Sequence, residues 1–261
     1  MKKILVNRHA GKGYQYSIIP ENNEMEHRPI NEINSLKALF DAWESAHEKE
    51  EKPEETFPAY PVCKTQLEIE ALKKSFCPDG VTSEAGNVKF DQESNAHVDV
   101  LFVLKEANIN GRAETNKTFW FDQKPEDSDR KRYCKKLMAA LKILKDKKML
   151  DDSVNGRFGY MNLNKRGGFG HTSPKKLKNY VIKYSDYINR QIELHSPKII
   201  IFCGCYNVVA KNVLGVEKWN KKPGRTKING KETHLYYIYH PAAPTFQKSL
   251  ENLKKIPMPF N

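Results

Sequence analysis

The sequence has no apolar stretch long enough to cross a membrane. A membrane-spanning helix needs about 20 consecutive apolar residues, and every apolar run here is far shorter. We therefore expect no transmembrane helix and no membrane partner. The apolar residues 4–6 after the basic start give way at Asn7, which is too early for a secretory signal. The expected location is cytoplasmic, and nucleoid-associated in a bacterium.

Cysteine is also scarce, and its spacing is uninformative. The chain has 5 cysteines in 261 residues and no C-x-x-C pair, so an odd number in a cytosolic chain argues against a disulfide framework. Cys203 and Cys205 flank Gly204 after an apolar run, where small buried residues at a tight turn are expected. Cys63 and Cys77 are the alternative partners for a metal site, but the spacings fit no metal pattern. We expect no metal.

Acidic residues are outnumbered by basic ones. Lysine and arginine total 44 against 32 acids, which gives a net charge of +12. That charge favours a polyanionic partner such as nucleic acid; a soluble basic protein without such a partner is the alternative. Repeats and low-complexity tracts are absent, and Gly11-Lys12-Gly13 lacks the frame of a phosphate-binding P-loop.

The chain divides near residue 95. Residues 1–95 form an N-terminal extension that we expect to pack on the core, with helices at 32–47 and 65–76 and a turn at Pro78-Asp79-Gly80. Residues 96–261 alternate between apolar strands and amphipathic helices. The expected strands are 98–104, 158–163, 198–202 and 235–239, and the expected helices are 130–150, 176–195, 207–214 and 244–253.

Strands that are apolar on both faces and separated by helices predict a parallel sheet covered on both sides. Ligands bind at the carboxyl ends of the strands in such sheets. Those ends carry Lys105-Glu106-Ala107-Asn108, Asn162-Leu163-Asn164-Lys165, Gly204 and His240-Pro241. A carboxylate, amides, a lysine and a histidine are therefore expected to converge at one edge.

These strand ends resemble the motifs of the uracil-DNA glycosylase superfamily. Glu106-Ala107 is similar to the E-A of G-E-A-P-G, without that motif's glycine and proline, and residues 162–165 are similar to N-A-V-K. Residues 190–215 resemble R-Q-I-E-L…P-K-V-I-V-A-L-G…A…L-L-G, and residues 240–243 match H-P-A-A. The blocks occur in the family's order over about 98–254, and the N-terminal third has no counterpart.

The resemblance implies a three-layer α/β/α fold with a central, mostly parallel four-stranded sheet. It implies a monomeric DNA N-glycosylase that flips a uracil, damaged or modified base out of the duplex. The cysteines that hold an iron–sulfur cluster in some members are absent, so no cofactor is expected. The altered first motif and the extra N-terminal third favour a target base other than uracil, and defence against modified foreign DNA is conceivable beside repair.

Breaking an N-glycosidic bond leaves positive charge on the sugar and negative charge on the base. Glu106, ionised at neutral pH with an ordinary pKa of about 4.3, would orient water and stabilise the sugar cation; a surface ion pair with Lys105 or Arg112 is the alternative. The resemblance assigns His240 to the leaving base, and its alternative is a strand-capping histidine. Asn162 matches the family residue that reads the base edge.

The remaining candidates would stack on the base or hold the DNA. Phe119 or Trp120 would stack on the flipped base, although three aromatics in a row also suit core packing. Phe246 would wedge into the vacated base stack, or simply start the closing helix. The glycine-rich segment after the second strand is expected to be a loop that contacts phosphates. The DNA-binding candidates are Lys105, Asn108, Arg112, Lys165, Arg166, Gly167, Gly168, Pro241 and Phe246.

Two other functions fit the sequence. A non-catalytic nucleic-acid binder on the same fold would not need both Glu106 and His240. An unrelated α/β hydrolase would act on free nucleosides and would not depend on basic loops.

Overall fold

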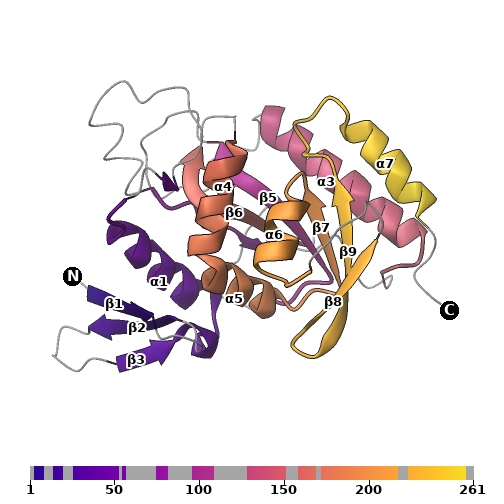
Figure 1. Cartoon of the computed structure of the whole chain (residues 1–261). Helices are drawn as coiled ribbons and strands as arrows, with labels where there is room; N and C mark the ends of the chain where they lie inside the picture. Colours follow the sequence, from indigo (N-terminus) through magenta and orange to yellow (C-terminus); the bar gives the residue numbers. More distant parts are fainter. Residues whose placement is uncertain are drawn as a thin grey trace, which may run out of the picture.

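The protein is an α/β fold built on a six-stranded, mostly parallel sheet (Figure 1). The computed structural model describes residues 3–8, 14–19, 26–52, 55–56, 75–81, 96–108, 128–150, 158–168, 172–216 and 223–256. The strand order is β4-β6-β5-β7-β9-β8. The strands are β4 (Gly80–Val81), β5 (Val100–Asn108), β6 (Gly159–Gly168), β7 (Ile199–Cys203), β8 (Gly224–Ile228) and β9 (Lys231–Ile238).

The four strands expected from the sequence form the parallel centre of this sheet. β6, β5, β7 and β9 run parallel to their neighbours. β4 and β8 extend the sheet at its two edges and run antiparallel, so the sheet has six strands rather than four. The turn expected at 78–80 is wrong, because Gly80 opens β4 and Asp79 is buried.

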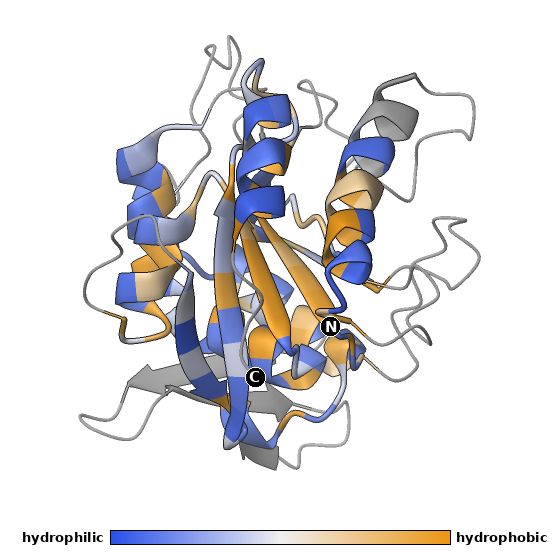
Figure 2. Ribbon diagram, turned by 90° about the vertical axis from the view of Figure 1, so that its right-hand side faces the viewer, coloured by the Kyte–Doolittle hydropathy of each residue, from blue (hydrophilic) through white to orange (hydrophobic). Residues whose placement is uncertain are grey.

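Side chains of successive strand residues enter two separate cores, as strand geometry requires. In β7, Ile200 and Phe202 share a core with α1 (Leu36–Glu48), α4 (Pro174–Lys183), α5 (Ser185–His195) and α6 (Tyr206–Asn212). Ile199 and Ile201 share the other core with α3 (Ser128–Asp146) and α7 (Phe246–Lys255). The hydrophobic centre of the sheet lies between helices with hydrophilic outer faces (Figure 2). The helices therefore form one layer on each side of the sheet.

The helices largely occupy the expected segments. The expected helix at 176–195 is two helices that meet at Tyr184, whose φ is −107°, although neither glycine nor proline marks the break. The helix bounds are α3 (Ser128–Asp146), α4 (Pro174–Lys183), α5 (Ser185–His195), α6 (Tyr206–Asn212) and α7 (Phe246–Lys255).

The N-terminal residues form a small antiparallel sheet followed by a helix. The sheet consists of β1 (Lys3–Arg8), β2 (Tyr14–Ile19) and β3 (Glu26–Pro29). A 3₁₀ turn, η1 (Ile30–Glu32), leads to α1 (Leu36–Glu48), and Ser35 caps α1 by accepting the N–H of Ala38. Residues 65–74 of the second expected helix lie outside the described residues.

Helix α1 shares a core with the main sheet. Trp43 is fully buried and stacks on Tyr187 and Tyr180, with ring centroids 5.4 and 6.3 Å away. Both tyrosines belong to the helices that cover the parallel strands, so α1 is built into that layer. Within the described ranges, no helix has both the length and the hydrophobicity to cross a membrane.

Candidate active site

Three neighbouring parallel strands end at the same edge of the sheet. Glu106 lies near the end of β5, Gly204 follows β7, and His240 follows β9. Because adjacent strands are about 4.8 Å apart, the backbones at the ends of β5 and β9 are separated by about 10 Å. Glu106 and His240 therefore lie at the same edge on strands two positions apart, with Gly204 of the intervening strand end between them.

Glu106 has a buried carboxyl group that makes no hydrogen bond of normal geometry with the described residues. Both of its carboxyl oxygens are shielded from solvent, and neither makes a hydrogen bond of normal geometry within the described part of the chain. Burial raises the pKa of Glu106 to about 7, while the nearby Thr172 hydroxyl and Lys105 ammonium act in the opposite direction. Burial thus opposes the full ionisation at neutral pH that was expected from the ordinary pKa of a glutamate.

Gly204 brings Lys105 and His240 together. Its φ is +76°, and a Cβ built there would lie 3.4 Å from Lys105 Cε and 3.4 Å from the backbone nitrogen of His240. The Gly204 N–H donates to the carbonyl of Ile238 at the end of β9. The turn after β7 thus needs a residue without a side chain, both for its left-handed conformation and for the close approach of its neighbours.

His240 is a neutral imidazole with a defined tautomer. Burial, together with the positive charges of Lys105 and Lys136, lowers the pKa of His240 to about 4. The backbone N–H of Ala242 donates to His240 Nδ1 at 3.2 Å, so the ring's single proton lies on Nε2. His240 can therefore donate a hydrogen bond through Nε2 at neutral pH without carrying a charge.

Helix α3 supports the segment after β9. Lys136 donates to the carbonyl of Pro241 at 2.5 Å and lies over the ring of Phe246, 5.2 Å from its centroid. Tyr133 packs edge-on against His240. Neither Tyr133 nor Lys136 was a candidate from the sequence. Finding them would have required knowing which face of α3 lies against the segment after β9.

Asn162 lies in β6, beside the end of β5. Its register partner is Leu104, two residues before Glu106. The side chain is 2% exposed, and its amide lies 3.1 Å (Nδ2) and 3.4 Å (Oδ1) from the Tyr160 hydroxyl. The amide is therefore held below the edge and already has one partner.

The expected glycine-rich phosphate loop at 165–170 is wrong over residues 165–168, and residues 169–170 lie outside the described residues. Residues 165–168 continue β6, where Gly167 and Gly168 pair with Ala107 and Asn108 of β5. The side chains of Lys165 and Arg166 are fully buried, so they cannot contact a phosphate in this conformation.

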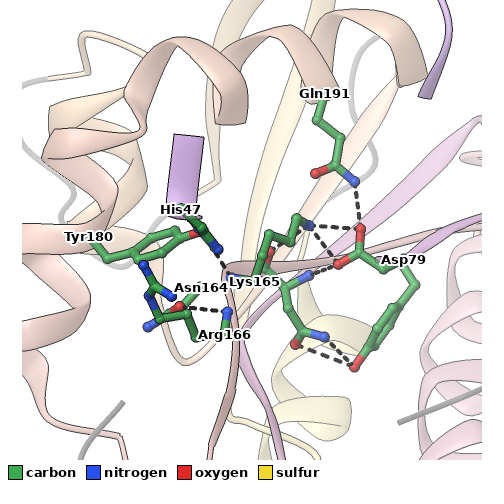
Figure 3. Close-up of polar contacts among 9 residues, drawn as sticks. His47, Asp79, Asn164, Lys165, Arg166, Tyr180 and Gln191 are labelled. Carbon is green, nitrogen blue, oxygen red and sulfur yellow. Dashed lines mark hydrogen bonds and ion pairs between the residues drawn. The ribbon is translucent and has the colours of Figure 1, made fainter. Parts of the chain in front are cut away.

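Both basic side chains are paired with acids inside the protein; Figure 3 shows the pair of Lys165 with Asp79. Lys165 pairs with Asp79 at 2.7 Å, and Arg166 pairs with Glu50 at 2.6 Å. Glu50 also accepts hydrogen bonds from Thr56 and Tyr184. Burying a lysine and an arginine requires such pairing. The partner acids, Asp79 and Glu50, come from the N-terminal third of the chain, which has no counterpart among the family motifs.

The expected wedge, Phe246, is also buried. It is 2% exposed and begins α7 within the core shared with α3. Pro241 is likewise buried. Phe246 therefore packs the closing helix against the sheet in this structure, and the alternative interpretation of this residue is correct.

Several candidates lie outside the described residues. Phe119, Trp120 and Arg112 belong to this group, and Asn108 is described only in its backbone. Their expected roles stay predictions. No cluster of three or more histidine, cysteine or acidic side chains suited to a metal occurs in the described part of the chain. Cys77, Cys203 and Cys205 are buried, and none of them is part of a disulfide.

Comparison with known proteins identifies no family. No family model matches the sequence, and no curated protein matches it either.

Proposed function

We propose that this protein is a DNA glycosylase of the uracil-DNA glycosylase type, hydrolysing the N-glycosidic bond of a flipped uracil, damaged or modified base. The observation that carries the proposal is Glu106: a buried carboxyl group with a pKa of about 7 and no conventional partner in the described part of the chain. It lies at the carboxyl edge of a parallel sheet, two strands away from a neutral histidine. Unpaired buried carboxyl groups of this kind are costly and concentrate at functional sites.

Glu106 would act on the sugar side of the bond. Its ionised form can accept a proton from water and direct the oxygen towards C1′, and its charge stabilises the positive sugar as the base departs. A pKa near 7 keeps a large ionised fraction at physiological pH and makes the carboxylate more basic than an exposed glutamate. The proton taken from water resides on the Glu106 carboxyl group after the step.

His240 would act on the base side. The departing base carries negative charge on its carbonyl oxygen, and a neutral Nε2–H can donate a hydrogen bond to that oxygen. Lys105, which approaches His240 across Gly204, adds positive charge on the same side. Glu106 on the sugar side and His240 on the base side thus come from the ends of different strands, β5 and β9.

Asn162 would read the base edge, as the resemblance to N-A-V-K implies. DNA would be drawn in by the net charge of +12. The buried Lys165, Arg166 and Phe246 are not part of this proposal. Phosphate contacts therefore fall to other basic side chains, of which Lys105 is the described candidate nearest the edge.

A cleavage assay on a panel of oligonucleotides tests the proposal. Single- and double-stranded substrates carrying uracil, mismatched, damaged and modified bases are incubated with the wild type, E106Q and H240A, and abasic sites are converted to strand breaks by alkali. The control is E251Q, which removes an exposed carboxylate from α7.

We expect the wild type and E251Q to release at least one base at equal rates. E106Q should be slower by about 100-fold or more, because general base catalysis contributes about that factor. Tight DNA binding without cleavage of any base would overturn the proposal in favour of a non-catalytic binder. Activity on free nucleosides alone would indicate a nucleoside hydrolase.

A further inference from the structure

We infer that Asp79, Lys165 and Tyr160 are positioning residues that fix Asn162 for base recognition. This inference rests on the proposed function and names three side chains that act through Asn162 rather than on the substrate. Asp79 belongs to the N-terminal third, so the inference also gives that part of the chain a role at the site.

The backbone of Asn162 is hydrogen-bonded to both members of an ion pair, Asp79 and Lys165. β4 is only two residues long and pairs with Gly159 and Tyr160, so β6 loses its strand partner on that side before Asn162. Asp79 lies directly before β4 and replaces the missing strand partner: its Oδ2 accepts a hydrogen bond from the N–H of Asn162 at 2.5 Å. Lys165 donates to the carbonyl oxygen of Asn162 at 2.8 Å.

The ion pair is itself anchored in the core. Lys165 donates to both oxygens of Asp79, at 2.8 and 2.7 Å, and Gln191 of α5 donates to Asp79 Oδ1 at 2.6 Å. Lys165 Nζ also lies over the rings of Trp43 and Phe40. Figure 3 shows Lys165 and Asp79 facing each other with Gln191 above them. Because both charged groups are fully buried and hydrogen-bonded to each other and to their neighbours, the pair has little freedom to move.

The side chain of Asn162 is held separately. The Tyr160 hydroxyl lies within hydrogen-bond distance of both amide atoms. An amide offers two N–H donors and two acceptor positions, so this single contact leaves a donor and an acceptor. Because the Asn162 side chain is only 2% exposed, a base reaches them only when the residues that cover the amide move aside. With backbone and amide both restrained, Asn162 can present these groups in one fixed place.

Two changes of the ion pair test the inference. D79L/K165M removes both charges together and both contacts with the backbone of Asn162. D79N/K165Q is also uncharged but keeps an acceptor for the Asn162 N–H and a donor for its carbonyl. The matched control is E50Q/R166M, which removes the charges of the other buried ion pair of β6; that pair makes its hydrogen bonds away from Asn162. N162A gives the size of the effect when the amide is lost altogether.

The readout is the single-turnover cleavage rate and the ratio of rates on two different bases, measured below all thermal midpoints. We expect D79L/K165M to lose about 10- to 100-fold in rate, as small displacements of positioning groups do, and to approach N162A in base selectivity. D79N/K165Q should recover much of that loss. E50Q/R166M should keep wild-type selectivity even where its thermal midpoint is lowered equally.

Tyr160→Phe provides an independent measurement should D79L/K165M fail to fold, because it removes only a hydroxyl group. We expect Y160F to shift selectivity towards that of N162A. Wild-type selectivity in Y160F or in D79L/K165M, or equal losses in D79L/K165M and E50Q/R166M, would overturn the inference while the proposed function stands. A wild type that cleaves no base would overturn both.

Discussion

At the scale of single residues, the proposed mechanism depends on the pKa of Glu106, which burial of the carboxyl group raises. A glutamate after an apolar strand could be recognised from the sequence, but its pKa could not, because the burial comes from segments distant in the chain. The same holds for His240, whose neutral state arises from burial and from Lys105 and Lys136. Residue identity was thus predictable where the protonation state was not.

The first prediction concerns the pH dependence of cleavage. If Glu106 acts in its ionised form, as proposed, its pKa of about 7 should make the single-turnover rate rise about tenfold per pH unit below 7 and level off above it. Histidine protonation should not intervene, since the pKa of His240 is about 4. A pH–rate profile from pH 5 to 9 checks this. A rate that is independent of pH below 7 would exclude Glu106 as the base.

The second prediction concerns stability. The pKa of Glu106 is higher in the folded protein than its ordinary value of 4.5, so the folded state retains a proton between about pH 4.5 and 7 that the unfolded state has lost. Rising pH therefore destabilises the wild type through this window. Relative to the wild type, E106Q should gain about 3 kcal/mol in unfolding free energy between pH 4 and 8.

Urea unfolding at both pH values measures this difference. E251Q serves as the control, because its exposed carboxyl group should give no comparable change. An E106Q difference that is the same at pH 4 and pH 8 would show that burial does not raise the pKa of Glu106.

At the scale of elements, the sequence located the four parallel strands because each is a short apolar run bounded by polar residues or turns. It did not reveal the edge strands β4 and β8. β4 has only two residues, and β8 (Gly224–Ile228) alternates between exposed and less exposed positions. The sequence also led to the prediction of a loop at residues 165–168, which are strand residues of β6. A lysine, an arginine and two glycines favour a loop unless acids elsewhere in the chain neutralise the charges. Asp79 and Glu50 do so from distant positions, which local patterns cannot show.

The third prediction concerns the turn between β7 and α6. Gly204 and Gly230 have the same φ of +76°, but a Cβ on Gly204 would crowd Lys105 and His240, whereas a Cβ on Gly230 would meet nothing within 4 Å. G230A should cost about 1 kcal/mol for the left-handed backbone alone. G204A should cost more and should also slow cleavage, because it displaces His240.

Thermal unfolding and single-turnover rates of the two variants provide the comparison. Equal destabilisation with unchanged rates would show that Gly204 serves the chain turn alone and does not shape the site.

At the scale of the whole molecule, the layered architecture followed from the alternation of strands and helices, and the net charge of +12 followed from composition. What composition could not show is where the charge lies: two of the basic residues expected on the DNA are neutralised in the interior. Lys165 and Arg166 of β6 therefore do not mark where the phosphate backbone of DNA would lie.

The fourth prediction is a strong dependence of DNA binding on salt. A basic protein that neutralises several phosphates loses affinity as counterions compete, so Kd should rise by about tenfold or more between 50 and 200 mM salt. Fluorescence anisotropy with a labelled duplex measures it. E106Q should show the same salt dependence, and a Kd that is insensitive to salt would contradict an electrostatic mode of DNA binding.

The central claim is that water, directed by Glu106, replaces a base on C1′ of the sugar. Its most direct test is mass spectrometry of the products formed in ¹⁸O-labelled water from the best substrate of the oligonucleotide panel. The account predicts an intact free base and an abasic strand that carries the label, with neither product accumulating at a comparable rate with E106Q. Cleavage at a phosphodiester bond with the base still attached, or equal yields from E106Q, would contradict it.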